Sequence, residues 1–184
     1  MNYKLVSGIF IFLWLVSGFY TGTGGITKLE NDILIKKAAE SLDTVKVIYD
    51  DISYKNKARL IAELETEQTT VIYPWLEQCP SFLAYMITAC SFGLLGALIS
   101  LFIELAFNNK ELNELKYLSI PLLGILTGIV VLGISFIIPS LIITGDKDIK
   151  PEALVFLCLF CGIFSKKFYR RISNILDKTI EIIS

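Results

Sequence analysis

Residues 81–107 read SFLAYMITACSFGLLGALISLFIELAF, and this stretch decides the class of fold. Its 27 residues carry a single charged side chain, that of Glu104. A helix of this length rises about 40 Å, which exceeds the roughly 30 Å of a bilayer's hydrocarbon core. The stretch therefore predicts a membrane-spanning helix that tilts in the bilayer or projects beyond it.

Three further hydrophobic runs flank this stretch, at residues 5–20, 117–144 and 153–165. The first run lacks the small-residue cleavage site of a signal peptide, so we interpret it as an uncleaved first helix. The last run has only 13 residues, and it spans a bilayer only if Lys166 and Lys167 reach the headgroups. We expect an all-α polytopic membrane protein with about four transmembrane helices.

The composition of the chain agrees with this class. Of the 184 residues, 54% are hydrophobic and 19% are charged, whereas soluble domains average about 45–50% and about 25%. The chain contains no histidine, which excludes histidine-based triads, general bases and metal ligands. A net charge of −1 provides no basic field for nucleic acid, so we expect no direct nucleic-acid readout.

Residues 26–80 differ in kind, because charged residues alternate there with apolar ones. Apolar residues at heptad spacing predict a long amphipathic, coiled-coil-like helix that follows a glycine-rich hinge at residues 22–25. This helix either packs on its own domain or self-associates around a symmetry axis. The residues expected to form this oligomerisation helix are Ile35, Leu42, Val45, Tyr49 and Ile52.

We therefore expect four segments along the chain. Residues 1–25 form the first transmembrane helix and the hinge, and residues 26–80 form the amphipathic helical segment. Residues 81–169 form a three-helix membrane domain, and residues 170–184 form a basic amphipathic tail.

Basic residues in short loops mark the cytoplasmic side of a membrane protein. They are concentrated after residue 165, so we place the C-terminus in the cytoplasm. Four spans then put residues 26–80 outside and the N-terminus inside. We expect a multi-pass protein of a bacterial inner membrane.

Small residues recur at helical spacing in two of the runs. Such faces let helix backbones approach closely in lipid, where little hydrophobic force acts between helices. The packing joins helices of one chain or subunits of a homo-oligomer, and both interpretations remain open. The residues are Ala89, Ala97, Gly124 and Gly128.

Glu104 lies inside a hydrophobic run, where an ionisable group suggests a functional site. Copies of Glu104 in an oligomer would form an acidic ring that favours cations at a pore mouth. Alternatively, Glu104 reaches the headgroups or pairs with Lys110 or Lys166. The candidate pore-lining residues are Gly93, Gly96, Ser100, Glu104, Thr127 and Ser135.

Basic residues form a cluster at the predicted cytoplasmic face. They suit contact with anionic lipid, or with a cytoplasmic anion such as a nucleotide phosphate. The residues are Lys110, Lys116, Lys166, Lys167, Arg170 and Arg171. The chain has no motif of a known catalytic site and four cysteines that we interpret as small buried residues, so we expect no enzyme, cofactor or metal.

The segments Phe160-Cys161-Gly162-Ile163-Phe164-Ser165-Lys166-Lys167-Phe168 and Gly93-Leu94-Leu95-Gly96-Ala97 resemble small bacterial membrane proteins. Some of these are similar to membrane effectors of anti-phage systems of the CBASS, Hailong or Kiwa kind. The resemblance covers about 40 residues and carries over no ligand-binding residue. It implies an effector that depolarises the membrane in response to an infection signal, often a nucleotide.

Two hypotheses follow. The first is a homo-oligomeric gated ion channel that responds to a cytoplasmic nucleotide or protein signal. The second is a non-conducting membrane anchor or scaffold that recruits a partner through residues 26–80 or through the tail.

Overall fold

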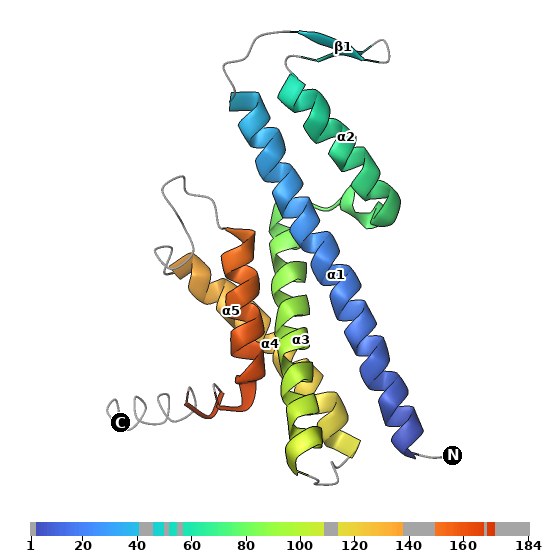
Figure 1. Cartoon of the computed structure of the whole chain (residues 1–184). Coiled ribbons are helices and arrows are strands. Elements are labelled where there is room, and N and C mark those ends of the chain that lie inside the picture. Colours follow the sequence, from blue (N-terminus) through green and yellow to red (C-terminus); the bar gives the residue numbers. More distant parts are fainter. Residues whose placement is uncertain are drawn as a thin grey trace. The chain divides into compact units, whose positions relative to one another are not determined.

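The computed structural model describes residues 3–40, 46–49, 52–54, 57–108, 114–137, 150–167 and 169–171. These residues are mostly helical, in agreement with the expected all-α class (Figure 1). The elements in chain order are α1 (Tyr3–Glu40), β1 (Val47–Tyr49), β2 (Ile52–Tyr54), α2 (Lys57–Ile72), η1 (Pro74–Leu76), α3 (Ser81–Asn108), α4 (Glu114–Ile137) and α5 (Pro151–Ile163).

Three of the described helices are long and apolar enough to cross a membrane. Their candidate spans are Gly8–Glu40, Ser81–Ala106 and Leu118–Ile137, so the fold is compatible with a membrane location. Helix α5 is apolar but shorter, and a fourth span there stays a prediction.

The chain forms two compact units. One unit, called the membrane unit below, comprises Met1–Gly22 and Met86–Ser184. The other comprises Thr23–Tyr85 and is called the Thr23–Tyr85 unit. Helices α1 and α3 each contribute residues to both units.

The expected hinge at residues 22–25 is wrong, because α1 is one continuous helix through this segment. The glycines there serve close packing. A Cβ at Gly22 would lie 3.1 Å from the Phe92 ring, and one at Gly24 would lie 2.5 Å from the Trp75 ring. Glycine is present at these positions because aromatic rings occupy the space of a side chain.

The prediction of a single coiled-coil-like helix over residues 35–52 is also wrong. Helix α1 ends at Glu40, and Tyr49 and Ile52 pair with each other in an antiparallel hairpin. The β-branched and aromatic residues of this segment favour strands, and the sequence places Asp50 and Asp51, common turn residues, between the strands. Leu42 and Val45 lie outside the described residues.

The Thr23–Tyr85 unit has a small apolar core with polar links across it. Leu29 and Leu76 are buried in this core. Asn31 is only 6% exposed, and its Nδ2 donates a hydrogen bond of 3.0 Å to Thr69 Oγ1 in α2. This hydrogen bond satisfies a buried amide and joins α1 to α2.

Candidate functional site

Helix α3 packs on α4 through backbone contacts at glycines. A Cβ built on Gly93 would lie 2.3 Å from the Gly124 carbonyl oxygen, and one built on Gly128 would lie 2.1 Å from the Ala89 carbonyl oxygen. No side chain fits between backbones this close. The small residues expected for helix packing therefore join two helices of the same chain.

The same segment of α3 also packs on α5 through backbone contacts at glycines. A Cβ on Gly96 would lie 2.2 Å from the Leu159 carbonyl oxygen, and a Cβ on Gly162 would lie 2.4 Å from that of Gly93. Ala97 is fully buried beside these contacts. Helix α3 is thus the shared partner of α4 and α5 in the membrane unit (Figure 1).

These contacts change the interpretation of two candidate pore residues. Gly93 and Gly96 are buried against α4 and α5 of their own chain, so within one chain neither faces an open path. Their small size serves the close approach of the backbones.

The candidate hydroxyls of α4 are also directed inward. Thr127 is fully buried, and its Oγ1 donates a 2.7 Å hydrogen bond to the Leu123 carbonyl oxygen. Ser135 is buried as well, and its Oγ donates a 2.7 Å hydrogen bond to the Val131 carbonyl oxygen. Both hydroxyls are satisfied by their own helix, as is common for such residues in lipid.

Helices α1 and α3 share a polar link that the sequence did not reveal. Thr21 Oγ1 in α1 lies 2.8 Å from Ser91 Oγ in α3, within hydrogen-bond distance. A Cβ on Gly18 would lie 2.8 Å from Leu94, so α1 also approaches α3 closely there. Small polar residues within both hydrophobic runs were the available signal.

Glu104 pairs with Lys166, one of the two partners considered from the sequence. Lys166 Nζ donates to Glu104 Oε2, and this bond joins α3 to the helical segment that follows α5. The side chains remain 42% exposed for Lys166 and 29% exposed for Glu104. In one chain the carboxylate is therefore neutralised by a partner at the edge of the bundle.

A hollow of about 380 Å³ lies beside this ion pair. Ser100 lines it, so Ser100 and Glu104 are the candidate pore residues that the structure brings together. The full lining is Ser100, Ile103, Glu104, Ile163, Phe164, Lys166 and Lys167. Lys167 Nζ also lies 5.9 Å from the centroid of the Phe164 ring, in the geometry of a cation–π contact.

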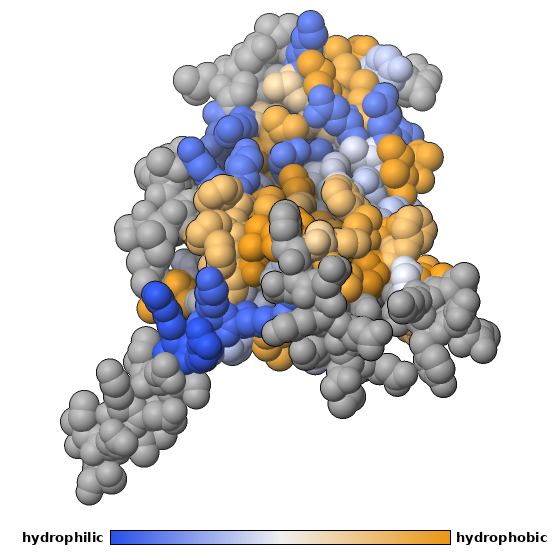
Figure 2. Space-filling view, turned by 60° about the horizontal axis from the view of Figure 1, so that its bottom comes forward, coloured by the Kyte–Doolittle hydropathy of each residue, from blue (hydrophilic) through white to orange (hydrophobic). Residues whose placement is uncertain are grey.

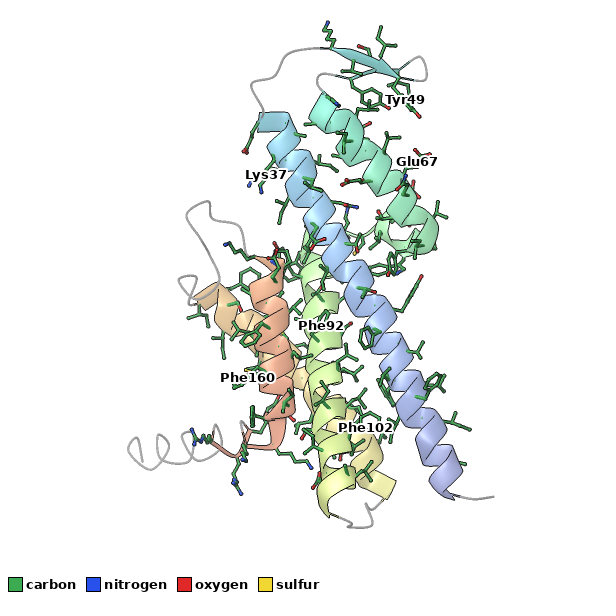
Figure 3. All side chains as sticks on the ribbon, in the orientation of Figure 1. Lys37, Tyr49, Glu67, Phe92, Phe102 and Phe160 are labelled. Carbon is green, nitrogen blue, oxygen red and sulfur yellow. The ribbon has the colours of Figure 1, made fainter. Side chains whose placement is uncertain are left out.

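The outer surface of α5 carries a ladder of phenylalanines. The Phe156 and Phe160 rings are stacked with centroids 6.2 Å apart, and the Phe160 and Phe164 centroids are 4.9 Å apart. All three side chains are exposed, and Figure 3 marks Phe160 on this helix. A surface of this kind suits contact with lipid chains or with another apolar surface.

A second exposed apolar surface lies on the Thr23–Tyr85 unit. Leu34 and Ile61 line a hollow of about 330 Å³ between α1 and α2, together with Lys37 and Glu65. The hairpin contacts α2, and Ile48 at 75% exposed is its most open apolar residue. Figure 3 marks Lys37 and Tyr49 at this part of the unit. We call this surface the distal apolar surface; its exposed apolar side chains are those of Leu34, Ile35, Ile61 and, on one face of the hairpin, Tyr49 and Ile52.

Cys79 is buried within the same unit, close to two charged residues. Burial raises the pKa of its thiol; Lys28 partly offsets this effect, and Asp32 adds to it. Lys28 Nζ lies 3.0 Å from Asp32 Oδ1, and Ser81 Oγ donates a 2.7 Å bond to Asp32 Oδ2. A buried thiol with a raised pKa is a poor nucleophile.

The structure describes three of the four remaining basic candidate residues. Arg170 and Arg171 are exposed in a short helical segment at residues 169–171. Lys116 lies in α4, and Lys110 falls outside the described residues. Within the described ranges, no group of three or more possible metal ligands occurs.

Comparison with protein-family models, curated proteins and solved structures found no match to this chain.

Proposed function

We propose that this protein is a non-conducting membrane anchor and assembly subunit. The membrane unit fixes the chain in a bacterial inner membrane with its C-terminus in the cytoplasm and α5 as a fourth span. The Thr23–Tyr85 unit binds a protein partner, and no catalytic step is involved.

The distal apolar surface is the observation that carries this function. Five large apolar side chains are exposed there on a unit whose helices also carry many charged residues. Exposed apolar side chains bordered by charged residues mark a site of protein contact. Burial of such side chains against a partner stabilises a complex by about 25 cal/mol per Å² of apolar area, before the cost of association.

The packing of the membrane unit supports an anchor. Helices α3, α4 and α5 meet at backbone distance, and Thr127 and Ser135 bond to their own helix. Many large apolar side chains of α3, α4 and α5 are exposed, which suits lipid.

A second copy of the chain is the partner that this surface fits best. Lys37 and Glu65 line the same hollow, so a two-fold arrangement of two copies can pair each lysine with the other copy's glutamate. The hairpin has two strands, and a two-stranded sheet offers its outer edges for pairing with another copy.

The test is the oligomeric state of the full chain, measured by mass photometry in nanodiscs. We expect wild type to form dimers or larger assemblies and Ile61→Glu to be monomeric. Val71→Glu is the matched control, because it introduces the same charge at an exposed apolar residue of α2 outside the distal apolar surface. A wild-type protein that stays monomeric at micromolar concentration would overturn the proposed self-assembly.

A gated ion channel is the second candidate, because Ser100 and Glu104 line the same hollow. In this alternative, a homo-oligomeric effector depolarises the membrane in anti-phage defence, and a cytoplasmic nucleotide or protein signal opens the path. A voltage-sensitive dye in cells with induced expression separates the two candidates. Depolarisation that weakens in Glu104→Gln supports the channel, whereas a steady potential with well-inserted protein supports the anchor.

A further inference from the structure

The hollow beside the Glu104–Lys166 pair combines charged and apolar walls. Glu104, Lys166 and Lys167 provide the charges, and Ile103, Ile163 and Phe164 provide the apolar part. It lies within the membrane unit, at the C-terminal ends of two apolar helices, α3 and α5. In Figure 2, strongly hydrophilic residues lie directly beside hydrophobic surface.

The charge balance of this region is positive. Lys166 is paired with Glu104, so the two charges offset each other. Lys167 lies over the Phe164 ring, and Arg170 and Arg171 are exposed in the next helical segment. This region therefore has four basic side chains and one carboxylate. The excess of three positive charges favours an anionic ligand.

The apolar walls of the hollow indicate that the anionic ligand also has an apolar part. Ile103 is 49% exposed and Phe164 is 42% exposed, and Phe160 and Phe156 continue the exposed surface along α5. A free phosphate gains nothing from such walls, whereas an amphiphile places its chain along them. Basic pockets between transmembrane helices at the cytoplasmic side bind anionic headgroups.

We propose that this hollow binds the phosphate headgroup of an anionic phospholipid, with an acyl chain along the Phe156–Phe160–Phe164 ladder. Lys167 contacts the phosphate directly. Lys166 is shared between the phosphate and Glu104, so the carboxylate weakens the site and limits its occupancy. This site is independent of the distal apolar surface and of self-assembly.

The experiment measures lipid retention by the purified full chain in native mass spectrometry. The probes are phosphatidylglycerol, phosphatidylcholine and soluble glycerol 3-phosphate. We expect wild type to retain phosphatidylglycerol in preference to the other two. One basic residue at an anionic headgroup is worth about fivefold in affinity, so Lys167→Gln should lower retention of phosphatidylglycerol about fivefold.

Lys150→Gln is the matched control, because Lys150 is exposed at the other end of α5 and the change removes the same charge. Equal retention by the Lys167→Gln and Lys150→Gln proteins would overturn the site. Equal binding of glycerol 3-phosphate and phosphatidylglycerol would overturn the lipid as its ligand.

Glu104→Gln should change the retention of phosphatidylglycerol in the opposite direction. It removes the competing carboxylate and releases Lys166, so retention of phosphatidylglycerol should rise about fivefold. The melting temperature and helical circular dichroism of the variant establish that it is folded. A folded Glu104→Gln protein that retains less phosphatidylglycerol than wild type would contradict the proposed competition.

Discussion

At the scale of single residues, the glycines of α3 and α4 determine how the membrane unit packs. Their spacing in the sequence predicted small helix-packing faces, and the structure places them in contact inside one chain. The sequence could not choose between packing within a chain and between chains, because both use the same small residues. It left two partners open for Glu104, because the choice depends on how α3 and the segment after α5 lie together.

Alanine substitution at Gly93 should destabilise the bundle by about 1–3 kcal/mol, because the added methyl group meets the Gly124 backbone. Gly133→Ala is the control, since a Cβ there meets nothing within 4 Å. That change should be neutral or stabilising by about 0.5–1 kcal/mol, because glycine is a weak helix former. Thermal unfolding in detergent measures both, and similar losses at the two positions would contradict the backbone contact.

The thiol of Cys79 should react slowly with N-ethylmaleimide at pH 8, because its raised pKa keeps it protonated. Lys28→Gln should slow alkylation further, and Asp32→Asn should accelerate it, because these charges shift the pKa in opposite directions. Peptide mass spectrometry assigns the label to Cys79. Alkylation as fast as that of an unfolded control at the same pH would show that the thiol is not buried.

The same shift affects stability at alkaline pH. The folded-state pKa of Cys79 lies above the ordinary thiol value of 9.0, so the unfolded chain loses this proton first as the pH rises. The contribution of the neutral thiol is fully present below pH 9.0 and is lost as the pH rises through the folded-state pKa.

At the scale of elements, the apolar helices could be predicted and the segment between them could not. Length and hydrophobicity are sufficient for a membrane helix, and α3 matches its predicted run closely. The segment after α1 has apolar residues at helical spacing, but these include residues that favour strands. Around Tyr49 and Ile52 the chain forms strands. The glycines of α1 suggested a hinge, because a sequence does not show the aromatic rings that pack against them.

The pairing of α1 with α2 depends on the buried amide of Asn31. Asn31→Ala leaves the Thr69 hydroxyl without this donor, and the Thr23–Tyr85 unit should lose about 1–3 kcal/mol. Gln68→Ala, at an exposed position of α2, should change stability by less than about 0.5 kcal/mol. Hydrogen exchange at the α2 amides measures both variants, and equal protection in the two would contradict a structural role for Asn31.

At the scale of the whole molecule, composition predicted the membrane class, and three helices now qualify as spans. The number of spans depends on α5, whose 13 residues rise about 20 Å, less than a hydrocarbon core. The orientation rests on the distribution of basic residues around the helices. The fourth span and the orientation both stay predictions.

Reporter tags test the path of the chain across the membrane. A tag inserted after Lys150 and a tag at the C-terminus should lie on opposite sides, because α5 lies between them. The C-terminal tag should be protected from protease in intact spheroplasts, and the internal tag should be cleaved. Protection of both tags would show that α5 enters the bilayer and returns, which would reduce the number of spans to three.

The central place of α3 has a consequence for how the protein is made. A ribosome delivers α1 first, so in a membrane this helix would be inserted before its partner α3 has been synthesised. Thr21 would then expose an unsatisfied hydroxyl to lipid, but its Oγ1 also donates a 2.7 Å bond to the Ser17 carbonyl oxygen. This hydrogen bond within α1 satisfies the hydroxyl until α3 is in place. Ser91 of α3 would then meet a hydroxyl that is already hydrogen-bonded within its own helix.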